Sequence, residues 1–172
     1  RVALLEIDYS FSGKNVMLRG VTTSAEAKTI LLKELAKKGY TVMDCLKVLP
    51  DGKDLEGKTY GIINVSVANL RVSPDFSSEM MTQGLMGMPV RVLQRDGWIR
   101  IQTPDDYIAW VHRVGVHPVT KEEMAAWNSA EKIVVTAHYG FVYSEPDQTS
   151  QTISDVAAGN RLRWEGSKGA FY

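Results

Sequence analysis

The sequence of 172 residues lacks several features that whole classes of protein need. Its single cysteine, Cys45, excludes an internal disulfide framework and a cysteine-based structural zinc site. Its 20 basic and 20 acidic residues give a formal net charge of zero. Proteins that bind nucleic acid by neutralising phosphates usually carry a basic surplus, so we expect no nucleic-acid partner. The apolar runs are only a few residues long, as in Tyr107–Val111, so we also expect no membrane span.

Two stretches of the chain are similar to each other at an offset of 72 residues. When Leu70 is laid over Val142 without gaps, 31 positions contain six identities, which is more than chance supplies. The identical pairs are Pro74/Pro146, Asp75/Asp147, Ser78/Ser150, Gly87/Gly159, Arg91/Arg163 and Gly97/Gly169. Glycine and proline fix turns that each copy of a fold has to keep. Internal self-similarity of this kind indicates a duplicated module.

The second copy of this module ends early. The first copy continues past Arg100 through a turn at 104–106 and an apolar run, whereas the second copy ends at Tyr172, which aligns with Arg100. A sheet without its last strands leaves backbone groups unpaired and one apolar face open. We therefore expect the natural polypeptide to continue beyond Tyr172, and the first residue, Arg1, indicates numbering that begins inside a longer or processed precursor.

Patterning divides the chain into four regions and predicts a mostly β fold. Residues 1–57 are expected to form a small α+β domain, 59–117 a barrel, 118–131 a helical connector, and 132–172 a second barrel truncated before its closing strands. In the first region, two strands around a Gly13 turn precede a helix that begins at a Thr23/Glu26 capping box. The helix is expected to place one apolar face on the core, consisting of Ala27, Ile30, Leu31 and Leu35.

The barrel at 59–117 is predicted from short alternating runs. Five strands are expected, at 62–68, 80–85, 90–95, 98–103 and 107–111. Asp96-Gly97 is a strong two-residue hairpin signal between two of them. In the connector, Thr120 and Glu123 form a second capping box that opens a short helix, with Met124 and Trp127 on its apolar side.

Four segments of the first barrel resemble the bacterial SH3-like domain: Val67–Arg71 followed by Pro74, Gly87–Leu93, Gly97–Ile101 and Tyr107–Val111. The resemblance covers 60–117 well and 132–172 more weakly. The order of regions resembles the N-terminal half of NlpC-type cell-wall cysteine peptidases, closest to the Bacteroides-type dipeptidyl-peptidase VI group. The resemblance implies tandem SH3-like domains ahead of a papain-like catalytic domain, which cleaves the γ-D-glutamyl–diamino-acid bond of peptidoglycan stem peptides. The sequence departs from the pattern at Asp106 and Ala109, where glycine is usual, and at Ala170, which lies opposite Trp98.

No catalytic residue is predicted within these 172 residues. Asp44-Cys45 is followed by Leu46 and Lys47 instead of the Ser-Gly of the family's nucleophile motif, and Cys45 lies on a predicted strand instead of at a helix start. We expect a small buried thiol there. The three histidines, His112, His117 and His138, have no metal-binding or catalytic spacing, so we expect no metal and no cofactor.

The candidate substrate-binding residues are Tyr107, Asp105, Asp106 and Arg71. The resemblance implies that the first SH3-like domain forms one wall of the catalytic cleft and recognises the free amino end of the stem peptide. Tyr107 begins a strand beside a polar turn, where its ring packs and its hydroxyl stays free. A phenol or a carboxylate holds an ammonium group. The two aspartates are also ordinary turn residues, and Arg71 is suited either to a substrate carboxylate or to a surface salt bridge. Trp98 and Trp110 are expected in the core.

The predicted function is substrate shaping and cell-wall targeting for a peptidoglycan stem-peptide cysteine endopeptidase. Its partners are stem peptides and the chain's own catalytic domain beyond residue 172. The alternative is a non-enzymatic wall-binding or sensory protein built of SH3-like repeats. An adaptor for proline-rich peptides is disfavoured, because the sequence shows no cluster of aromatic and acidic residues for a polyproline helix. The presumed substrate predicts a periplasmic or extracellular location, with or without a lipid anchor.

Overall fold

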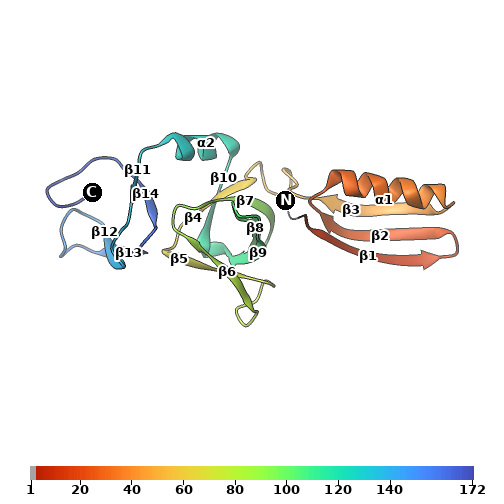
Figure 1. Cartoon of the computed structure of the whole chain (residues 1–172), viewed down its shortest axis with the longest axis horizontal. Coiled ribbons are helices and arrows are strands. Elements are labelled where there is room, and N and C mark those ends of the chain that lie inside the picture. Colours follow the sequence, from red (N-terminus) through yellow and green to blue (C-terminus); the bar gives the residue numbers. More distant parts are fainter. Residues whose placement is uncertain (1–2) are drawn as a thin grey trace. The chain divides into compact units, whose positions relative to one another are not determined.

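The computed structural model describes residues 3–172, which form two compact units, one ending at Asp51 and one running from Gly52 to Tyr172. The first unit consists of β1 (Leu5–Ser12), β2 (Asn15–Thr22), α1 (Ala25–Lys37) and β3 (Thr41–Val48). Strand β2 pairs antiparallel with β1 and parallel with β3. Helix α1 makes the crossover between the two parallel strands and lies along the sheet (Figure 1). The expected small α+β unit is therefore confirmed.

Helix α1 begins one residue later than the sequence predicts. Its N-cap is Ser24, whose Oγ accepts a hydrogen bond from the backbone N–H of Ala27 at 3.1 Å. The hydroxyl of Thr23 instead accepts from the backbone N–H of Leu4 at 2.9 Å. The predicted Thr23/Glu26 capping box is therefore wrong, because Thr23 is engaged with the segment that leads into β1.

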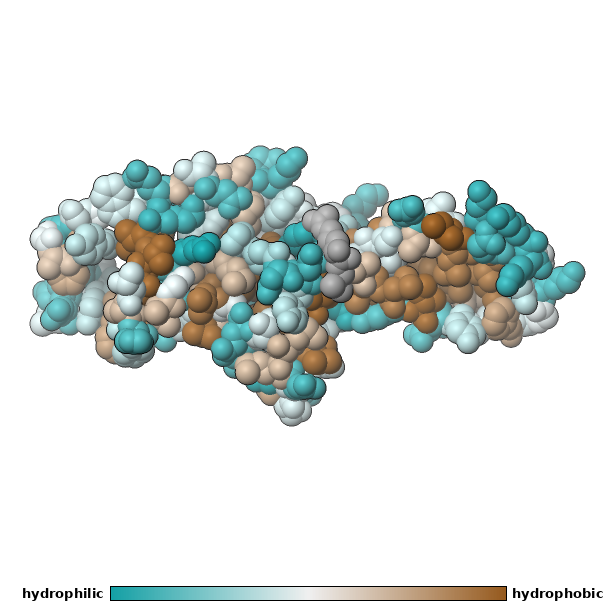
Figure 2. Space-filling view, in the orientation of Figure 1, coloured by the Kyte–Doolittle hydropathy of each residue, from teal (hydrophilic) through white to brown (hydrophobic). Residues whose placement is uncertain are grey.

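The core of this unit lies between α1 and the sheet. Val16, Leu18 and Leu46 are buried, and the partly buried side chains that pack on them are Ile7, Leu31, Leu32, Leu35 and Val42. Ile30, which the sequence places on this face, is instead 54% exposed. Hydrophobic surface is visible over this unit in Figure 2, and its large exposed apolar residues include Leu5, Phe11 and Met43.

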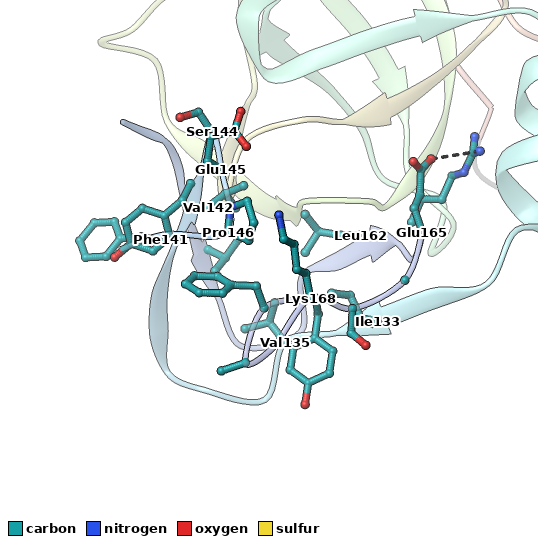
Figure 3. Close-up of a pocket in the computed structure, with 18 residues that line it drawn as sticks. Ile133, Val135, Phe141, Val142, Ser144, Glu145, Pro146, Leu162, Glu165 and Lys168 are labelled. Atoms are coloured by element: carbon teal, nitrogen blue, oxygen red, sulfur yellow. Dashed lines mark ion pairs between the residues drawn. The ribbon is translucent and has the colours of Figure 1, made fainter. Parts of the chain in front are cut away.

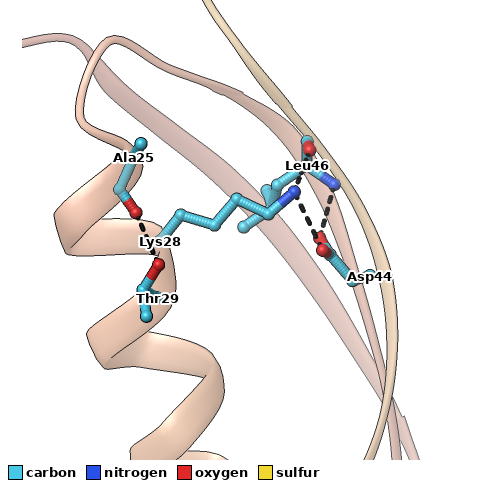
Figure 4. Close-up of polar contacts among 5 residues, drawn as sticks. All are labelled: Ala25, Lys28, Thr29, Asp44 and Leu46. Carbon is cyan, nitrogen blue, oxygen red and sulfur yellow. Dashed lines mark hydrogen bonds and ion pairs between the residues drawn. The ribbon is translucent and has the colours of Figure 1, made fainter.

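Lys28 links α1 to β3 across the edge of this core (Figure 4). Its Nζ donates a hydrogen bond to the carbonyl of Leu46 and forms an ion pair with Asp44 at 2.8 Å. Asp44 Oδ1 also accepts the backbone N–H of Leu46 at 3.0 Å. The hydrogen bond from Lys28 is the main reason why the pKa of Asp44 lies below its usual value. Because the pair is partly exposed, we expect it to position the helix more than to stabilise the unit.

The second unit contains a seven-stranded antiparallel sheet in the order β10-β4-β7-β8-β9-β5-β6. Its strands are β4 (Tyr60–Ile63), β5 (Val67–Arg71), β6 (Met80–Leu85), β7 (Pro89–Asp96), β8 (Trp98–Gln102), β9 (Ile108–His112) and β10 (Val116–Val119). The tight turn between β7 and β8 places Gly97 at a φ of 67°, a left-handed conformation that glycine adopts without strain. The core residues are Leu55, Ile63, Ala68, Leu70, Val90, Val92, Ile99, Ile101, Ala109, Val111 and Val116. This arrangement confirms the expected mostly β chain with an SH3-like domain.

Two details of this sheet differ from the sequence prediction. The single strand expected at 62–68 is two strands, β4 and β5, which separate around Asn64. There the backbone N–H of Asn64 still bonds to the carbonyl of Gly115 at 3.2 Å, next to the β4–β10 pair, whereas β5 pairs with β6 and β9. No glycine or proline marks this break in the sequence. The prediction also missed β10, which pairs antiparallel with β4.

Helix α2 (Lys121–Ser129) follows β10. Its capping box is confirmed: Thr120 Oγ1 accepts the N–H of Glu123 at 3.2 Å, and Glu123 Oε2 accepts the N–H of Thr120 at 2.7 Å. Met124 is buried, as expected. Trp127 lies under the ammonium group of Lys132, 5.1 Å from the ring centre. No helix within residues 3–172 has the length and apolar composition needed to cross a bilayer.

The repeat predicted from the sequence is present in the strand pairing. The remaining strands are β11 (Lys132–Val134), β12 (Tyr139–Tyr143), β13 (Thr152–Ala157) and β14 (Arg161–Arg163), and each begins 72 residues after β4, β5, β6 and β7. Strands β11 and β14 pair as β4 and β7 do, and β12 and β13 pair as β5 and β6 do. The register is the same, including an irregularity between Leu70 and Arg71 that recurs between Val142 and Tyr143.

The two copies contact each other directly. The buried Asn160 donates from Nδ2 to the carbonyl of Ser66 at 2.8 Å, and Ser66 Oγ donates to Asp155 at 2.7 Å. The backbone N–H of Arg161 donates to the carbonyl of Met86 at 2.9 Å. A Cβ on Gly87 would lie 2.3 Å from the carbonyl oxygen of Arg161, so the copies are packed closely at this point.

Candidate functional site

The turn that joins β8 to β9 holds three of the predicted site residues together. Thr103 organises it: its backbone N–H donates to the carbonyl of Tyr107 at 2.9 Å, and its Oγ1 accepts the N–H of Tyr107 at 3.0 Å. Thr103 is buried, whereas Asp105 is exposed and the side chain of Tyr107 is 46% exposed. The exposed Tyr107 and Asp105 therefore lie on a turn that hydrogen bonds to the buried Thr103 hold in place.

Asp106 has a different position in the same turn. It has a φ of 70°, which explains why glycine is usual at this place in the motif. Its Oδ1 accepts a hydrogen bond from Gln102 Nε2 at 3.1 Å, and Gln102 in turn accepts from Arg91 at 3.0 Å. Asp106 thus shapes the turn through this chain of contacts. Asp105 and Tyr107 are exposed, whereas Asp106 is half-buried.

Arg71 does not belong to this turn. It lies on β5, where it pairs with Trp110 of β9, and its Nη1 donates to the carbonyl of Ser78 at 2.6 Å. Its side chain lines a separate cavity that contains neither Tyr107 nor Asp105. The structure therefore groups three of the four predicted residues and separates the fourth.

The cavity beside Arg71 is walled by an aromatic cluster that the sequence did not predict. The ring of Phe76, from the loop after β5, lies 4.9 Å from the ring of Trp98 and 5.0 Å from that of His112. Trp98 and His112 are paired residues on β8 and β9, with ring centres 5.3 Å apart. Trp98 is only half-buried, in contrast to the expected core position, whereas Trp110 is buried with Arg100 stacked 4.7 Å from its ring. No periodicity links three residues that come from a loop and two strand ends.

The cysteine considered in the sequence analysis, Cys45, lies on β3 of the first unit. Cys45 is exposed, so the predicted buried thiol is wrong. The reason is the alternation of β3, in which Val42 and Leu46 face α1 and Cys45 points to the opposite side of the sheet. The unit that holds Cys45 has no histidine in its sequence. Within residues 3–172, no three His, Cys, Asp or Glu side chains are close enough to hold a metal.

The second copy contains an open cavity of about 740 Å³ (Figure 3). Its apolar lining includes Val135, Val142 and Leu162, which occupy the repeat positions of Ile63, Leu70 and Val90. Aromatic side chains from β12 and the chain end line the same cavity, with Tyr143 and Phe171 6.4 Å apart. In the first copy, the residues at these positions are covered by β8 and β9.

Known proteins are similar to this chain in two respects: the sequence of the first copy and the overall fold. Residues 70–114 match the family described as the bacterial dipeptidyl-peptidase SH3 domain. No curated protein matches the chain. An NlpC/P60 family protein from Bacillus cereus ATCC 10987 is similar in structure, with a TM-score of 0.51 and 18% identity over 63% of this chain and 48% of that chain. An NlpC/P60 endopeptidase from Photobacterium damselae subsp. piscicida also has a TM-score of 0.51, with 13% identity over 83% of this chain and 33% of that chain.

The chain thus spans about half the length of the first of these proteins and a third of the second. At these identities the likeness concerns the fold. Residues 70–114 are similar to the SH3 domain of bacterial dipeptidyl-peptidases, and the fold of the chain is shared with parts of two NlpC/P60 proteins.

Proposed function

We propose that the chain is the substrate-shaping and cell-wall-targeting region of a peptidoglycan stem-peptide cysteine endopeptidase of the NlpC/P60 type. The observation that carries this proposal is the match of residues 70–114 to the bacterial dipeptidyl-peptidase SH3 domain. The fold shared with two NlpC/P60 proteins supports it. The bond cleaved by the parent enzyme is the γ-D-glutamyl–diamino-acid bond, as in the Bacteroides dipeptidyl-peptidase VI group.

The proposal assigns catalysis to a domain beyond residue 172. The exposed strand position of Cys45 supports this, because a nucleophilic thiol needs a histidine or a helix N-terminus beside it. The proposal also treats 132–172 as a second SH3-like barrel that further strands complete. The identical strand register of the two copies and the open cavity of the second copy support that part.

In this proposal, Tyr107 and Asp105 bind the free amino end of the stem peptide. A carboxylate and a phenol oxygen both accept hydrogen bonds from an ammonium group, and the carboxylate also pairs with its charge. Asp106 keeps the turn in its left-handed conformation and so positions both neighbours. Because its presumed substrate lies in the cell wall, the protein is assigned to the periplasm or the cell exterior, with or without a lipid anchor.

The test uses the full-length parent protein and the peptide L-Ala-γ-D-Glu-diaminopimelate, with its amino end free or acetylated. Tyr107→Ala and Asp105→Asn are expected to reduce the preference for the free amine, measured as a ratio of kcat/KM values, by about tenfold or more, since a hydrogen bond to a charged group contributes about 1.5–3 kcal/mol. Tyr139→Ala is the matched control, because Tyr139 is an exposed tyrosine in the second copy.

An unchanged preference in both variants would remove Tyr107 and Asp105 from the site. The sequence that follows Tyr172 distinguishes the enzyme from a non-enzymatic wall-binding or sensory protein. An Asp-Cys-Ser-Gly motif at a helix start, followed by a histidine, is the expected result. A continuation with SH3-like repeats alone would contradict the proposal.

A further inference from the structure

The cavity beside Arg71 lies where strands β5 and β9 meet. Its volume is about 190 Å³, and we call it the aromatic groove, defined by Val67, Arg71, Phe76, Trp98, His112 and Val114. Strands β5 and β9 pair at one residue only, Arg71 with Trp110. From that pair they diverge, and the groove is lined by Val67 on one strand and Val111 on the other. A space between two diverging strand edges suits an extended chain.

The walls of the groove offer an apolar anchor. Phe76 is 67% exposed, although its ring is packed on both Trp98 and His112. Exposed aromatic rings held in place by neighbours supply contact area at a low entropic cost and are frequent at binding sites. A typical pocket for a whole small ligand measures about 300–1,000 Å³. At about 190 Å³, this cavity fits one aliphatic side chain of a longer ligand.

The ionisable side chains that line the groove are basic. The ionisable residues that line it are Arg71 and His112, and none of the described lining residues is an aspartate or a glutamate. The bond from Arg71 Nη1 to the carbonyl of Ser78 fixes the guanidinium in place. Asp75, in the same loop, accepts hydrogen bonds from the backbone N–H and the hydroxyl of Ser77, and the charge of Arg71 is a smaller cause of its lowered pKa. Four further N–H donors of a guanidinium suit a carboxylate.

We propose that the aromatic groove binds an extended peptide that ends in a free carboxylate. One apolar side chain of the peptide enters the cavity beside Phe76 and Trp98, and the carboxylate pairs with Arg71. The groove lies at the opposite end of the β8–β9 pair from Tyr107, since Trp98 pairs with His112 and Gln102 pairs with Ile108. It is therefore a second site, separate from the proposed recognition of an amino end.

The experiment uses this chain and the peptide acetyl-Ala-Val-Ala with a free C-terminal carboxylate. The blocked amine keeps the probe from the Tyr107 turn, so the outcome does not depend on the proposed function. In a two-dimensional NMR titration, the indole N–H of Trp98 and the amides of Phe76 and His112 are expected to shift in a saturable way. The same peptide with a C-terminal amide is expected to bind at least fivefold more weakly.

Variants locate the binding. Phe76→Ala, at an exposed position, is expected to weaken binding at least fivefold, and Arg71→Lys is expected to reduce the difference between the acid and the amide, because a lysine cannot form the bidentate pair. Tyr139→Ala, an exposed aromatic outside the groove, is the control and should leave binding unchanged. Equal affinity for acid and amide, shifts confined to the Tyr107 turn, or no saturable shift at millimolar peptide would overturn the proposal. So would shifts of these residues with N-acetylglucosamine oligomers but not with the peptide.

Discussion

Leu70 and Val142 occupy the same position in the two copies of the repeat but have different surroundings. Leu70 is fully buried in a core that includes Ile99, Ile101 and Val111 from β8 and β9. Val142 lies in the same strand register, yet it lines the open cavity of about 740 Å³. The first four strands therefore pair in the same register whether or not further strands cover them. Burial of the core depends on a hairpin that only the first copy has within these 172 residues.

The largest expected difference between the copies is in the stability lost when an equivalent core residue is shortened. Leu70→Ala is expected to lower the free energy of unfolding of the second unit by about 2–5 kcal/mol, the usual range for a buried leucine. Val142→Ala is expected to cost less than about 1 kcal/mol, because Val142 is only half-buried and lines an open cavity. Urea unfolding followed by tryptophan fluorescence measures both.

The pair Val90 and Leu162 provides a control, because the larger residue is in the second copy. Val90 is 4% exposed and Leu162 is half-buried. If the burial of the side chain determines the loss of unfolding free energy, Val90→Ala is the more destabilising change. A larger loss for Leu162→Ala would show that side-chain size decides it, and the contrast between the copies would then fail.

The equivalent glycines Gly87 and Gly159 test the contact between the copies. Both have positive φ angles, 83° and 89°, so alanine at either is expected to cost about 1–2 kcal/mol from backbone strain alone. A Cβ at Gly87 would meet the carbonyl oxygen of Arg161 at 2.3 Å, whereas one at Gly159 would meet the flexible side chain of Leu85 at 2.9 Å. Gly87→Ala is therefore expected to be the more destabilising by at least about 1 kcal/mol in urea unfolding. Equal losses would mean that the close approach of Arg161 has no energetic weight.

The smallest expected effect concerns the equivalent aspartates Asp75 and Asp147. The backbone N–H of Ser77 holds the pKa of Asp75 below its usual value, and that of Thr149 does the same for Asp147, with the two hydroxyls contributing next. Each carboxylate therefore supports its loop above its ordinary pKa of 3.8, and this support is lost as the pH falls through the lowered pKa. Carbon-detected NMR titration should give both midpoints below 3.8, moving only partly upward in Ser77→Ala and Thr149→Ala. A pKa at its usual value in one of the two aspartates would show that the two loops do not hold their carboxylates in the same way.

The sequence predicted the features that depend on local signals. Six identities, five of them in turns or loops, were enough to align the copies, and the pairing follows that alignment residue by residue. The capping box at Thr120 was also predictable, because capping uses residues three apart. The break between β4 and β5 was not, because it follows from tertiary strand pairing: β4 pairs with β7 and β10, whereas β5 pairs with β6 and β9.

The candidate site was predictable only where it is a contiguous turn. Asp105, Asp106 and Tyr107 are adjacent in sequence, and the structure keeps them on one turn. Arg71 was assigned by residue type, and its surroundings came from strand pairing that the sequence did not reveal. The exposure of Cys45 depends on which side of β3 the helix covers, and the Phe76 cluster depends on how a loop folds onto β8 and β9. Both are consequences of tertiary packing.

The most direct test of the relation between the copies is a chimaera in which residues 98–117 of the first copy replace residues 170–172. Hydrogen–deuterium exchange would be measured on β12 and β14 in the chimaera and in the present chain. If the second copy is an open version of the first, the transplanted hairpin should slow exchange at both strands toward the rates of β5 and β7. Exchange in the present chain that is already as slow as in β5 and β7, or that the hairpin does not change, would contradict the account.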